Sequence, residues 1–175
     1  AYDRVFALQP SPANGMTMCQ GNVALMTDDL PAAIRHFGAA GRIHFLYVCH
    51  HDLTGGHDTE QVRAALGKVD FVVYQGSWDQ PTAAMAQVQL PAAVYAEEAG
   101  TFINLQGRVQ RITAAVPPLG SSLPGLDILA RLARELQIPL PAASAGAVFE
   151  EIAGQVGAFA GMTYDTVGDA GQLLR

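Results

Sequence analysis

The chain has 175 residues, of which 50% are apolar and 15% are charged, and its formal net charge is -6. This composition excludes a disordered chain, which combines low hydrophobicity with high net charge, and a binder of duplex nucleic acid, which neutralises phosphates with Lys and Arg. Because about 25% charged residues is usual, we expect part of the surface to lie against other protein.

No segment is typical of a membrane helix or a secretory signal. The longest stretch without charged residues, Val5–Thr27, is interrupted by Gln, Pro, Asn and Gly, whereas a membrane helix needs ~20 predominantly apolar residues. No basic region precedes an apolar core, so the sequence predicts neither a signal peptide nor direct membrane insertion. A strand-like segment follows Ala1 almost at once, and we interpret this start as a cut inside a longer polypeptide.

In chain order, the first ninety residues alternate between strand-like and helix-like segments. Apolar runs predict strands at Val5–Leu8, Ile43–Cys49, Phe71–Tyr74 and Val88–Leu90. Capping residues, prolines in a first turn and helical spacing predict helices over 28–37, 58–66 and 79–86. Strands separated by helix-length segments predict an α/β fold with a Rossmann-like, mostly parallel sheet and flanking helices.

The pattern changes near Gly100. Residues 100–112 predict a β excursion of two arms that meet at Gly107, where we expect a positive φ. Helical spacing then predicts a helix over Leu126–Leu136, with Leu132 buried, and a second helix over Val148–Val156. The last fifteen residues show no strong pattern. We divide the chain into an α/β domain, 1–137, and a linker with a helical C-terminal part, 138–175.

The densest cluster of polar side chains follows the predicted strand Ile43–Cys49. It consists of Cys49, His50, His51 and Asp52, with His57 and Asp58 shortly after. These residue types can ligate zinc, but neighbours on a strand point to opposite faces, and no second Cys/His pair stands at finger-like spacing. We therefore predict no metal site. The position is still informative, because α/β proteins bind ligands outside the carboxyl ends of their strands.

No other pattern indicates a catalytic site. The sequence has no GxGxxG fingerprint and no phosphate loop, and its adjacent carboxylate pairs fit helix caps and solvated surface. Ser121 and Ser122 lie in a linker with no histidine placed by pattern, so we predict no catalytic residue. We expect Cys19 and Cys49 to be buried reduced thiols.

Several stretches resemble the large-subunit signature of the molybdopterin oxidoreductase family. That signature has a strand ending in Gln-Asp, then Thr-Glu-Thr-Ala, Ala-Asp-Val-Val-Leu-Pro and Glu-x-x-Gly-Thr-x-x-Asn. The matching segments here are Phe71–Gln75, Thr82-Ala83, Leu90–Ala93, Glu98–Asn104 and Gly107–Gln110. The resemblance covers roughly residues 2–165.

Within the family, the ending Asn104–Gln110 followed by Pro117-Pro118 is similar to the G chain of bacterial NADH–quinone oxidoreductase, respiratory complex I. This resemblance implies a structural fragment of a subunit that carries iron–sulfur clusters elsewhere and passes electrons from NADH to quinone. It also implies partners within its own polypeptide and in a membrane-bound complex, on the cytoplasmic face of the inner membrane.

Departures from the family pattern favour a vestigial pocket that binds no pterin or molybdenum. His50–Leu53 replace Gly-Glu-Asn-Pro, Gly76 and Gln87 each replace Asp, and Pro81 replaces Glu. The alternative is a piece of an active molybdopterin-dinucleotide enzyme such as a formate dehydrogenase, with His51, Asp52 and Gln75 against the guanosine end of the cofactor. A third interpretation is a free-standing nucleotide-binding module.

Overall fold

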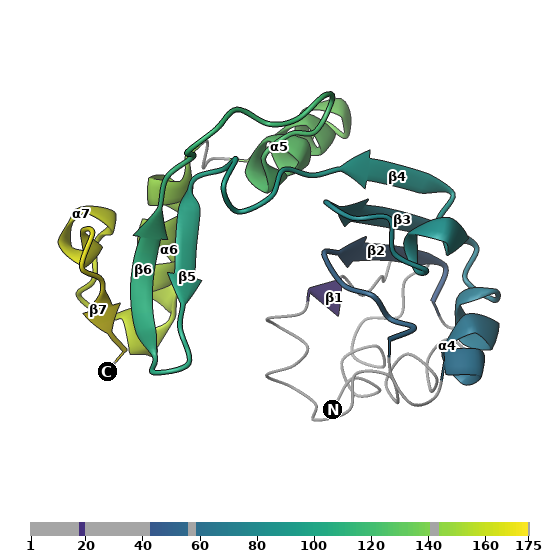
Figure 1. Ribbon diagram of the computed structural model, residues 1–175, viewed down its shortest axis with the longest axis horizontal. Coiled ribbons are helices and arrows are strands. Elements are labelled where there is room, and N and C mark those ends of the chain that lie inside the picture. Colours follow the sequence, from purple (N-terminus) through teal and green to yellow (C-terminus); the bar gives the residue numbers. More distant parts are fainter. Residues whose placement is uncertain (1–17, 20–42, 56–58, 141–143, 175) are drawn as a thin grey trace. The chain divides into compact units, whose positions relative to one another are not determined.

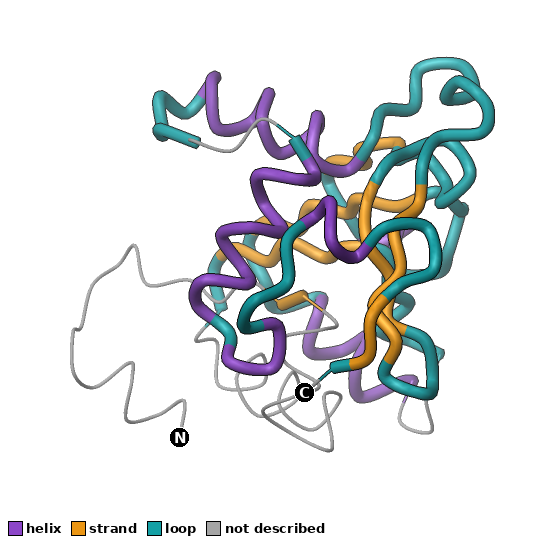
Figure 2. The backbone as a smooth tube through the Cα atoms, turned by 90° about the vertical axis from the view of Figure 1, so that its left-hand side faces the viewer, coloured by secondary structure: helices purple, strands orange, loops and turns teal. Residues whose placement is uncertain are grey.

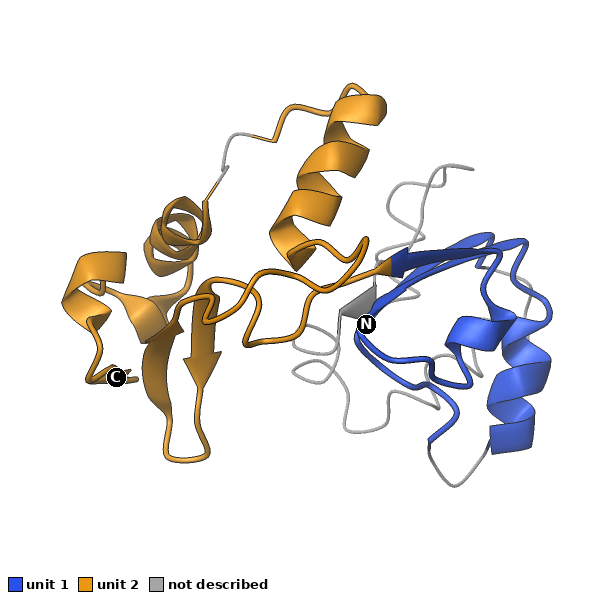
Figure 3. Ribbon diagram, turned by 45° about the horizontal axis from the view of Figure 1, so that its top comes forward, with its two compact units in different colours: residues 1–90 blue, residues 91–175 orange. Residues whose placement is uncertain are grey.

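The computed structural model describes residues 18–19, 43–55, 59–140 and 144–174. The chain forms two compact units, residues 1–90 (unit 1) and 91–175 (unit 2), which are coloured separately in Figure 3. The sequence-based boundary after residue 137 concerns domain organisation and stays a prediction. The strand expected at Val5–Leu8, the helix expected over 28–37 and the capping residue Asp58 lie outside the described residues.

Unit 1 is built on a four-stranded sheet in the order β1-β2-β3-β4. Its strands are β1 (Met18–Cys19), β2 (Phe45–Cys49), β3 (Phe71–Gly76) and β4 (Val88–Pro91). The β1-β2 and β2-β3 pairs are parallel, and Cys49 lies opposite Gln75 in the register. The predicted α/β fold with a mostly parallel sheet is therefore confirmed (Figure 1).

The core of unit 1 lies between this sheet and helix α4 (Thr59–Leu66). The strands contribute Leu46, Val48 and Val72, and α4 contributes its face of Val62, Ala65 and Leu66. The helix predicted over 79–86 is a single 3-10 turn, η1 (Ala83–Met85). It is shorter than expected because apolar residues with helical spacing fill only its second half, after Pro81.

Unit 2 contains a three-stranded antiparallel sheet in the order β5-β6-β7. The predicted excursion is the hairpin of β5 (Gly100–Ile103) and β6 (Arg108–Ile112), and β7 (Gln172–Leu173) pairs with β6. The helices are α5 (Gly125–Glu135), α6 (Ala145–Gln155), the turn η2 (Gly157–Phe159) and α7 (Tyr164–Val167). Figure 2 shows these elements by type.

The hairpin turn closes as expected at Gly107, which has a φ of 75°. Asn104 organises the turn, because its Oδ1 accepts hydrogen bonds from the N–H groups of Gln106 and Arg108, both at 2.9 Å. Arg108 donates to the carbonyls of Ala170 and Gly171. These polar side chains therefore hydrogen-bond within the chain.

The core of unit 2 is small. Its fully buried members are Val109, Phe149, Met162 and Val167. The Phe149 ring meets that of Phe159 edge to face, at 5.9 Å between centroids. The expected burial of Leu132 is wrong: Leu132 is half-buried, while α5 buries Ile128 and leaves Leu129 exposed. Helical spacing identified the apolar face of α5 correctly. Of the residues on that face, only Ile128 is buried, so the spacing did not predict how far along the helix the burial extends.

Within the described part of the chain, no helix is long and apolar enough to cross a membrane.

Candidate functional site

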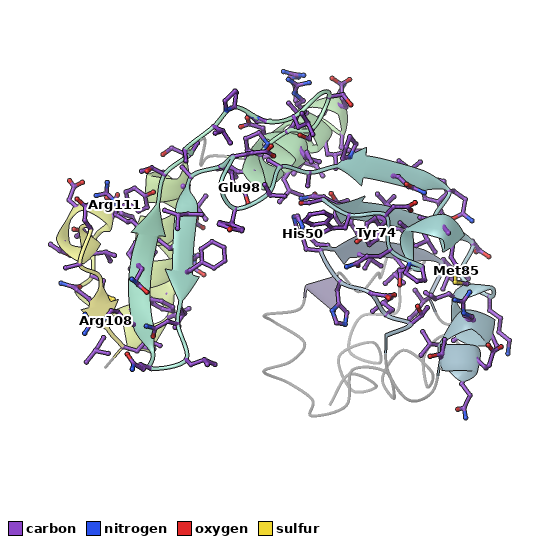
Figure 4. All side chains as sticks on the ribbon, in the orientation of Figure 1. His50, Tyr74, Met85, Glu98, Arg108 and Arg111 are labelled. Carbon is purple, nitrogen blue, oxygen red and sulfur yellow. The ribbon has the colours of Figure 1, made fainter. Side chains whose placement is uncertain are left out.

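Two loops at the carboxyl edge of the unit 1 sheet form the candidate site. The first follows β2 and contains His50, His51 and Asp52; the second connects the end of β3 with Thr82. The His50 N–H donates a 2.8 Å hydrogen bond to the Gln75 carbonyl, which joins the start of the first loop to the end of β3. Figure 4 shows His50 at this end of the strands. Parallel strands that end together are where α/β proteins bind ligands.

Asp52 and Thr82 hold the two loops together. The Thr82 hydroxyl is fully buried; it donates to Asp52 Oδ1 at 2.7 Å and accepts from the Leu53 N–H at 2.8 Å. The N–H and the hydroxyl of Thr54 also donate to Asp52 Oδ1, at 3.0 and 2.8 Å. The backbone of Thr82 also hydrogen-bonds the Asp52 carboxylate. Asp52 is therefore a carboxylate fixed by donors from both loops.

This network sets the charge of Asp52. Partial burial raises the pKa of the Asp52 carboxyl, but the hydrogen bonds from Thr82 and Thr54 favour the ionised form and together lower the pKa below its usual value. Asp52 is therefore an anion at neutral pH and can only accept hydrogen bonds.

His50 has an unusual backbone conformation, with a φ of 52°. Non-glycine residues pay a steric cost in this left-handed region, and such residues concentrate at functional sites. The side chain of His50 is exposed. The conformation explains why the resembling family has glycine at this place, because glycine adopts a positive φ without the cost.

The second loop is fixed by Tyr74. Its ring lies over Gly76, where an added Cβ would fall 2.5 Å from both Cε1 and the hydroxyl oxygen of Tyr74. The Tyr74 hydroxyl donates to Gln80 Oε1 at 2.8 Å. Position 76 therefore has to be glycine while the Tyr74 ring stays in this place, and no carboxylate can stand where the family signature has Asp.

Gln75 is directed into the protein. Its side chain is 1% exposed, and its Oε1 accepts a hydrogen bond from the Tyr47 hydroxyl. Burial, together with the nearby Cys49, raises the pKa of Tyr47 to about 12, so this phenol stays a neutral donor over the physiological range. The Gln75 side chain thus supports the end of β3 from inside.

The three residues that the alternative interpretation selected lie at one edge of the unit 1 sheet, but their side chains differ in direction. Asp52 and the partly exposed His51 are in the loop after β2, whereas Gln75 is in β3 and its side chain is buried. Gln87 lies elsewhere: its Oε1 accepts from the N–H of Val72, near the start of β3, at 2.7 Å. The change from Asp to Gln87 therefore does not affect this edge, contrary to what the signature comparison suggested.

Sequence reasoning gave no role to Tyr47, Tyr74 or Thr82. Thr82 and Tyr74 do stand in segments that match the family signature. Tyrosines inside apolar strands are indistinguishable by pattern from core residues. In the described residues, no group of three His, Cys, Asp or Glu side chains is placed to hold a metal ion. Cys49 is only partly buried, contrary to expectation. The side chain of Cys19 is outside those residues, so its burial stays a prediction.

Comparison with known proteins identifies relatives. The sequence profile of the molybdopterin oxidoreductase family matches residues 8–135. The chain is 37% identical over 133 residues to the F420-dependent formate dehydrogenase 2 subunit alpha of Methanococcus maripaludis, covering 74% of this chain and 20% of that protein. It is also 37% identical over 127 residues to a putative formate dehydrogenase of Staphylococcus haemolyticus, covering 71% of this chain and 13% of that protein.

Among solved structures, the acetylene hydratase from Pelobacter acetylenicus has a similar fold, with a TM-score of 0.64 and 16% sequence identity. The match covers 83% of this chain and 21% of the hydratase. The chain therefore spans about a fifth or less of the length of the proteins that it matches.

Proposed function

We propose that this chain, which belongs to the molybdopterin oxidoreductase family, is part of the catalytic subunit of a formate dehydrogenase and holds the nucleotide end of its cofactor. The observation that carries the proposal is Asp52: an anionic carboxylate that hydrogen bonds from Thr54 and Thr82 fix at the carboxyl edge of a parallel sheet. The named relatives, which are formate dehydrogenases, support the choice of reaction over the complex I interpretation.

The residues of this edge fit a guanine nucleotide. Guanine presents neighbouring N–H donors on one edge, and an ionised carboxylate can accept from them. In this proposal the Asp52 carboxylate receives the base, while His51 lies beside it in the same loop. Thr82 and Thr54 keep the carboxylate oriented, and Gln75 supports the strand end. When bound, a molybdopterin-type cofactor would supply the metal that takes electrons from formate; this chain would orient the far end of that cofactor.

A second candidate function keeps the fold without the cofactor. The missing carboxylate at Gly76, whose place the Tyr74 ring fills, favours a vestigial pocket in a structural subunit. In that case the partners would be further domains of the same polypeptide and subunits of a membrane-bound respiratory complex with iron–sulfur clusters of its own, on the cytoplasmic face of the membrane.

Elemental analysis of the protein that contains this chain separates the two candidates. The formate dehydrogenase proposal expects stoichiometric molybdenum or tungsten and formate-dependent reduction of an artificial dye. Asp52→Asn should lower the metal content, because the amide would turn an N–H₂ group toward the donors of the base. Absence of both metals from the intact purified protein would overturn the proposal in favour of the vestigial pocket.

A further inference from the structure

Helix α5 of unit 2 carries an apolar stripe that is only partly covered. Leu129, Leu132 and Leu136 recur at helical spacing on the side of Ile128. Ile128 is buried and Leu132 is half-buried, whereas Leu129 is 45% and Leu136 is 67% exposed. An amphipathic helix of a globular protein normally turns such a stripe toward a core. The exposed side chains of α5 therefore fit a partner that the described part of unit 2 does not supply.

The residues after α5 extend this stripe. Gln137 has a left-handed φ of 57°, and its N–H donates to the Arg134 carbonyl at 3.1 Å. The Ile138 N–H donates to the Ala133 carbonyl at 2.8 Å. These two hydrogen bonds form a Schellman motif, which turns the chain back against the last turn of a helix. Ile138, which is 56% exposed, is thereby held beside the end of the helix. We define the α5 stripe as Leu129, Leu132, Leu136 and Ile138.

Polar contacts hold the start of α5 in place. The N–H of Gly125, the first residue of the helix, donates to Glu98 Oε2 at 2.9 Å. A carboxylate is favourable here because the helix dipole is positive at this end. Just before the helix, the Leu123 carbonyl accepts from the Ala93 N–H at 2.8 Å, and the Leu123 N–H donates to the Pro91 carbonyl at 3.2 Å. Hydrogen bonds at the N-terminus thus fix the direction of α5 without covering its stripe.

The size of the stripe indicates which kind of partner covers it. The eleven residues of α5 make a helix about 16 Å long. Stable interfaces between separate proteins bury about 1,200–2,000 Å², which is more than one stripe of this length offers. A segment of the same polypeptide needs less contact, because tethering raises its effective concentration. The formate dehydrogenases named above are long enough to contain such a segment, since this chain spans 20% and 13% of their lengths.

We propose that the α5 stripe is the docking face for an apolar helix from a part of the same polypeptide outside residues 1–175. Side chains spaced three and four residues apart form ridges that fit the grooves of a second helix. The sequence of α5 contains two acidic and two basic residues, so the partner helix is selected by its apolar surface and not by its charge. Both candidate functions place this chain in a longer polypeptide, so the docking face does not depend on a cofactor.

Site-specific photocrosslinking in the intact purified protein tests this docking face. Leu136 is replaced with the photoreactive amino acid p-benzoylphenylalanine, and the products are analysed on denaturing gels and by mass spectrometry of their peptides. We expect a cross-link between position 136 and an apolar segment outside residues 1–175, at the mass of a single polypeptide. The matched control carries the same amino acid in place of Arg131, which is exposed on the polar side of α5, and should lose this product.

A double variant tests the same contact through hydrogen exchange of the intact protein. Leu129→Gln combined with Leu136→Gln removes two apolar side chains of the stripe, and glutamine has a helix propensity close to that of leucine. The α5 amides should exchange about tenfold faster or more, because lost apolar burial lowers the free energy of local opening. Leu119→Gln is the control and should leave this exchange unchanged, because Leu119 is 81% exposed in unit 2 and lies outside the stripe.

The other outcomes overturn the proposal. A product of doubled mass would assign the stripe to a second copy of the chain, and a product with a different polypeptide would assign it to another subunit. Cross-links that stay within residues 1–175 would show that the chain covers its own stripe. Reaction with water alone, or unchanged exchange in the double variant, would show that nothing docks there. Absence of molybdenum and tungsten, which overturns the formate dehydrogenase proposal, leaves these expectations unchanged.

Discussion

The carboxyl edge of unit 1 and the hairpin of unit 2 use their polar side chains differently. In unit 1, the Thr82 hydroxyl and Asp52 bond each other and join two loops at the edge of the sheet. In unit 2, Arg108 and Arg111 bond backbone carbonyls of the last twelve residues, and Arg111 also covers the Tyr164 ring at 4.6 Å from its centroid. The polar pair of unit 1 joins two loops of one sheet edge, whereas the arginines of unit 2 join the hairpin to the end of the chain.

The hairpin also exposes several apolar side chains. The hairpin leaves Phe102 at 52%, Ile103 at 49% and Leu105 at 108% of full exposure. Several exposed apolar side chains on one short hairpin favour a segment that meets protein. We interpret the edge of unit 1 as built to receive a small polar ligand and the hairpin as built to lie against protein. The four predictions below test this contrast.

The largest effect is expected in the small core of unit 2. Phe149 is 2% exposed and contacts the rings of Phe159 and Tyr164. Phe149→Ala should lower the free energy of unfolding of this unit by about 3–5 kcal/mol, the range for large cavities. Hydrogen exchange of residues 100–112 measures the loss. Leu129→Ala is the control: Leu129 is 45% exposed in α5, so a comparable loss there would contradict our account of the core.

The second prediction concerns the buried hydroxyl of unit 1. Thr82→Val keeps the shape but leaves the Leu53 N–H unpaired and removes a donor from Asp52. We expect a loss of about 1–3 kcal/mol, measured by urea unfolding followed through Trp78 emission. Thr82→Ser keeps the hydroxyl and should lose less. Equal losses in the two variants would show that the network does not hold these loops.

The same variant has a consequence for pH dependence. The folded-state pKa of Asp52 lies below its ordinary value of 3.8. Its contribution to stability is therefore complete above that value and is lost as the pH falls further, through the folded-state pKa. Thr82→Val should raise the pKa of Asp52 and weaken this loss, which an NMR titration of the carboxyl carbon measures. An unchanged pKa would show that Thr82 does not set the charge of Asp52.

Sequence patterns correctly predicted the structural features that depend on residues close together in the chain. The strands Phe45–Cys49 and Phe71–Gly76 and the hairpin turn at Gly107 follow from apolar runs and from local backbone requirements. The site depends on contacts between residues about thirty positions apart, such as Asp52 and Thr82. The spacing of apolar residues does not predict which distant residues come into contact. The strand β7 was missed because two residues are too few to show an alternation.

The third prediction compares two strained residues, one in each region. His50 and Gln137 both have left-handed φ values, 52° and 57°. Gln137 follows α5, where glycine commonly ends a helix. Replacing either residue with glycine should stabilise its unit by about 0.5–1 kcal/mol, because the steric cost of the side chain is removed. Urea unfolding measures both gains.

The two glycine variants should differ in binding. If the strain at His50 is kept because its imidazole takes part in the site, His50→Gly weakens GDP binding, whereas Gln137→Gly leaves it unchanged. Unaltered GDP binding in His50→Gly would show that the histidine is only a tolerated replacement for the glycine of the family signature.

The smallest effect distinguishes two glycines of unit 2 that both have open space around them. An added Cβ would meet nothing within 4 Å at Gly107 or at Gly154. Any difference between the two Gly→Ala variants therefore cannot come from clashes with neighbouring atoms. Gly107 has a φ of 75° in the hairpin turn, and Gly107→Ala should cost about 1 kcal/mol because the left-handed region disfavours a side chain. Gly154 lies within α6, so Gly154→Ala should instead stabilise the unit by about 0.5–1 kcal/mol.

Thermal unfolding followed by circular dichroism shows whether each variant is more or less stable than the original chain. A stabilising Gly107→Ala would mean that the turn relaxes freely in solution, and a hairpin that loose could not present Phe102 and Leu105 as a fixed face to another protein.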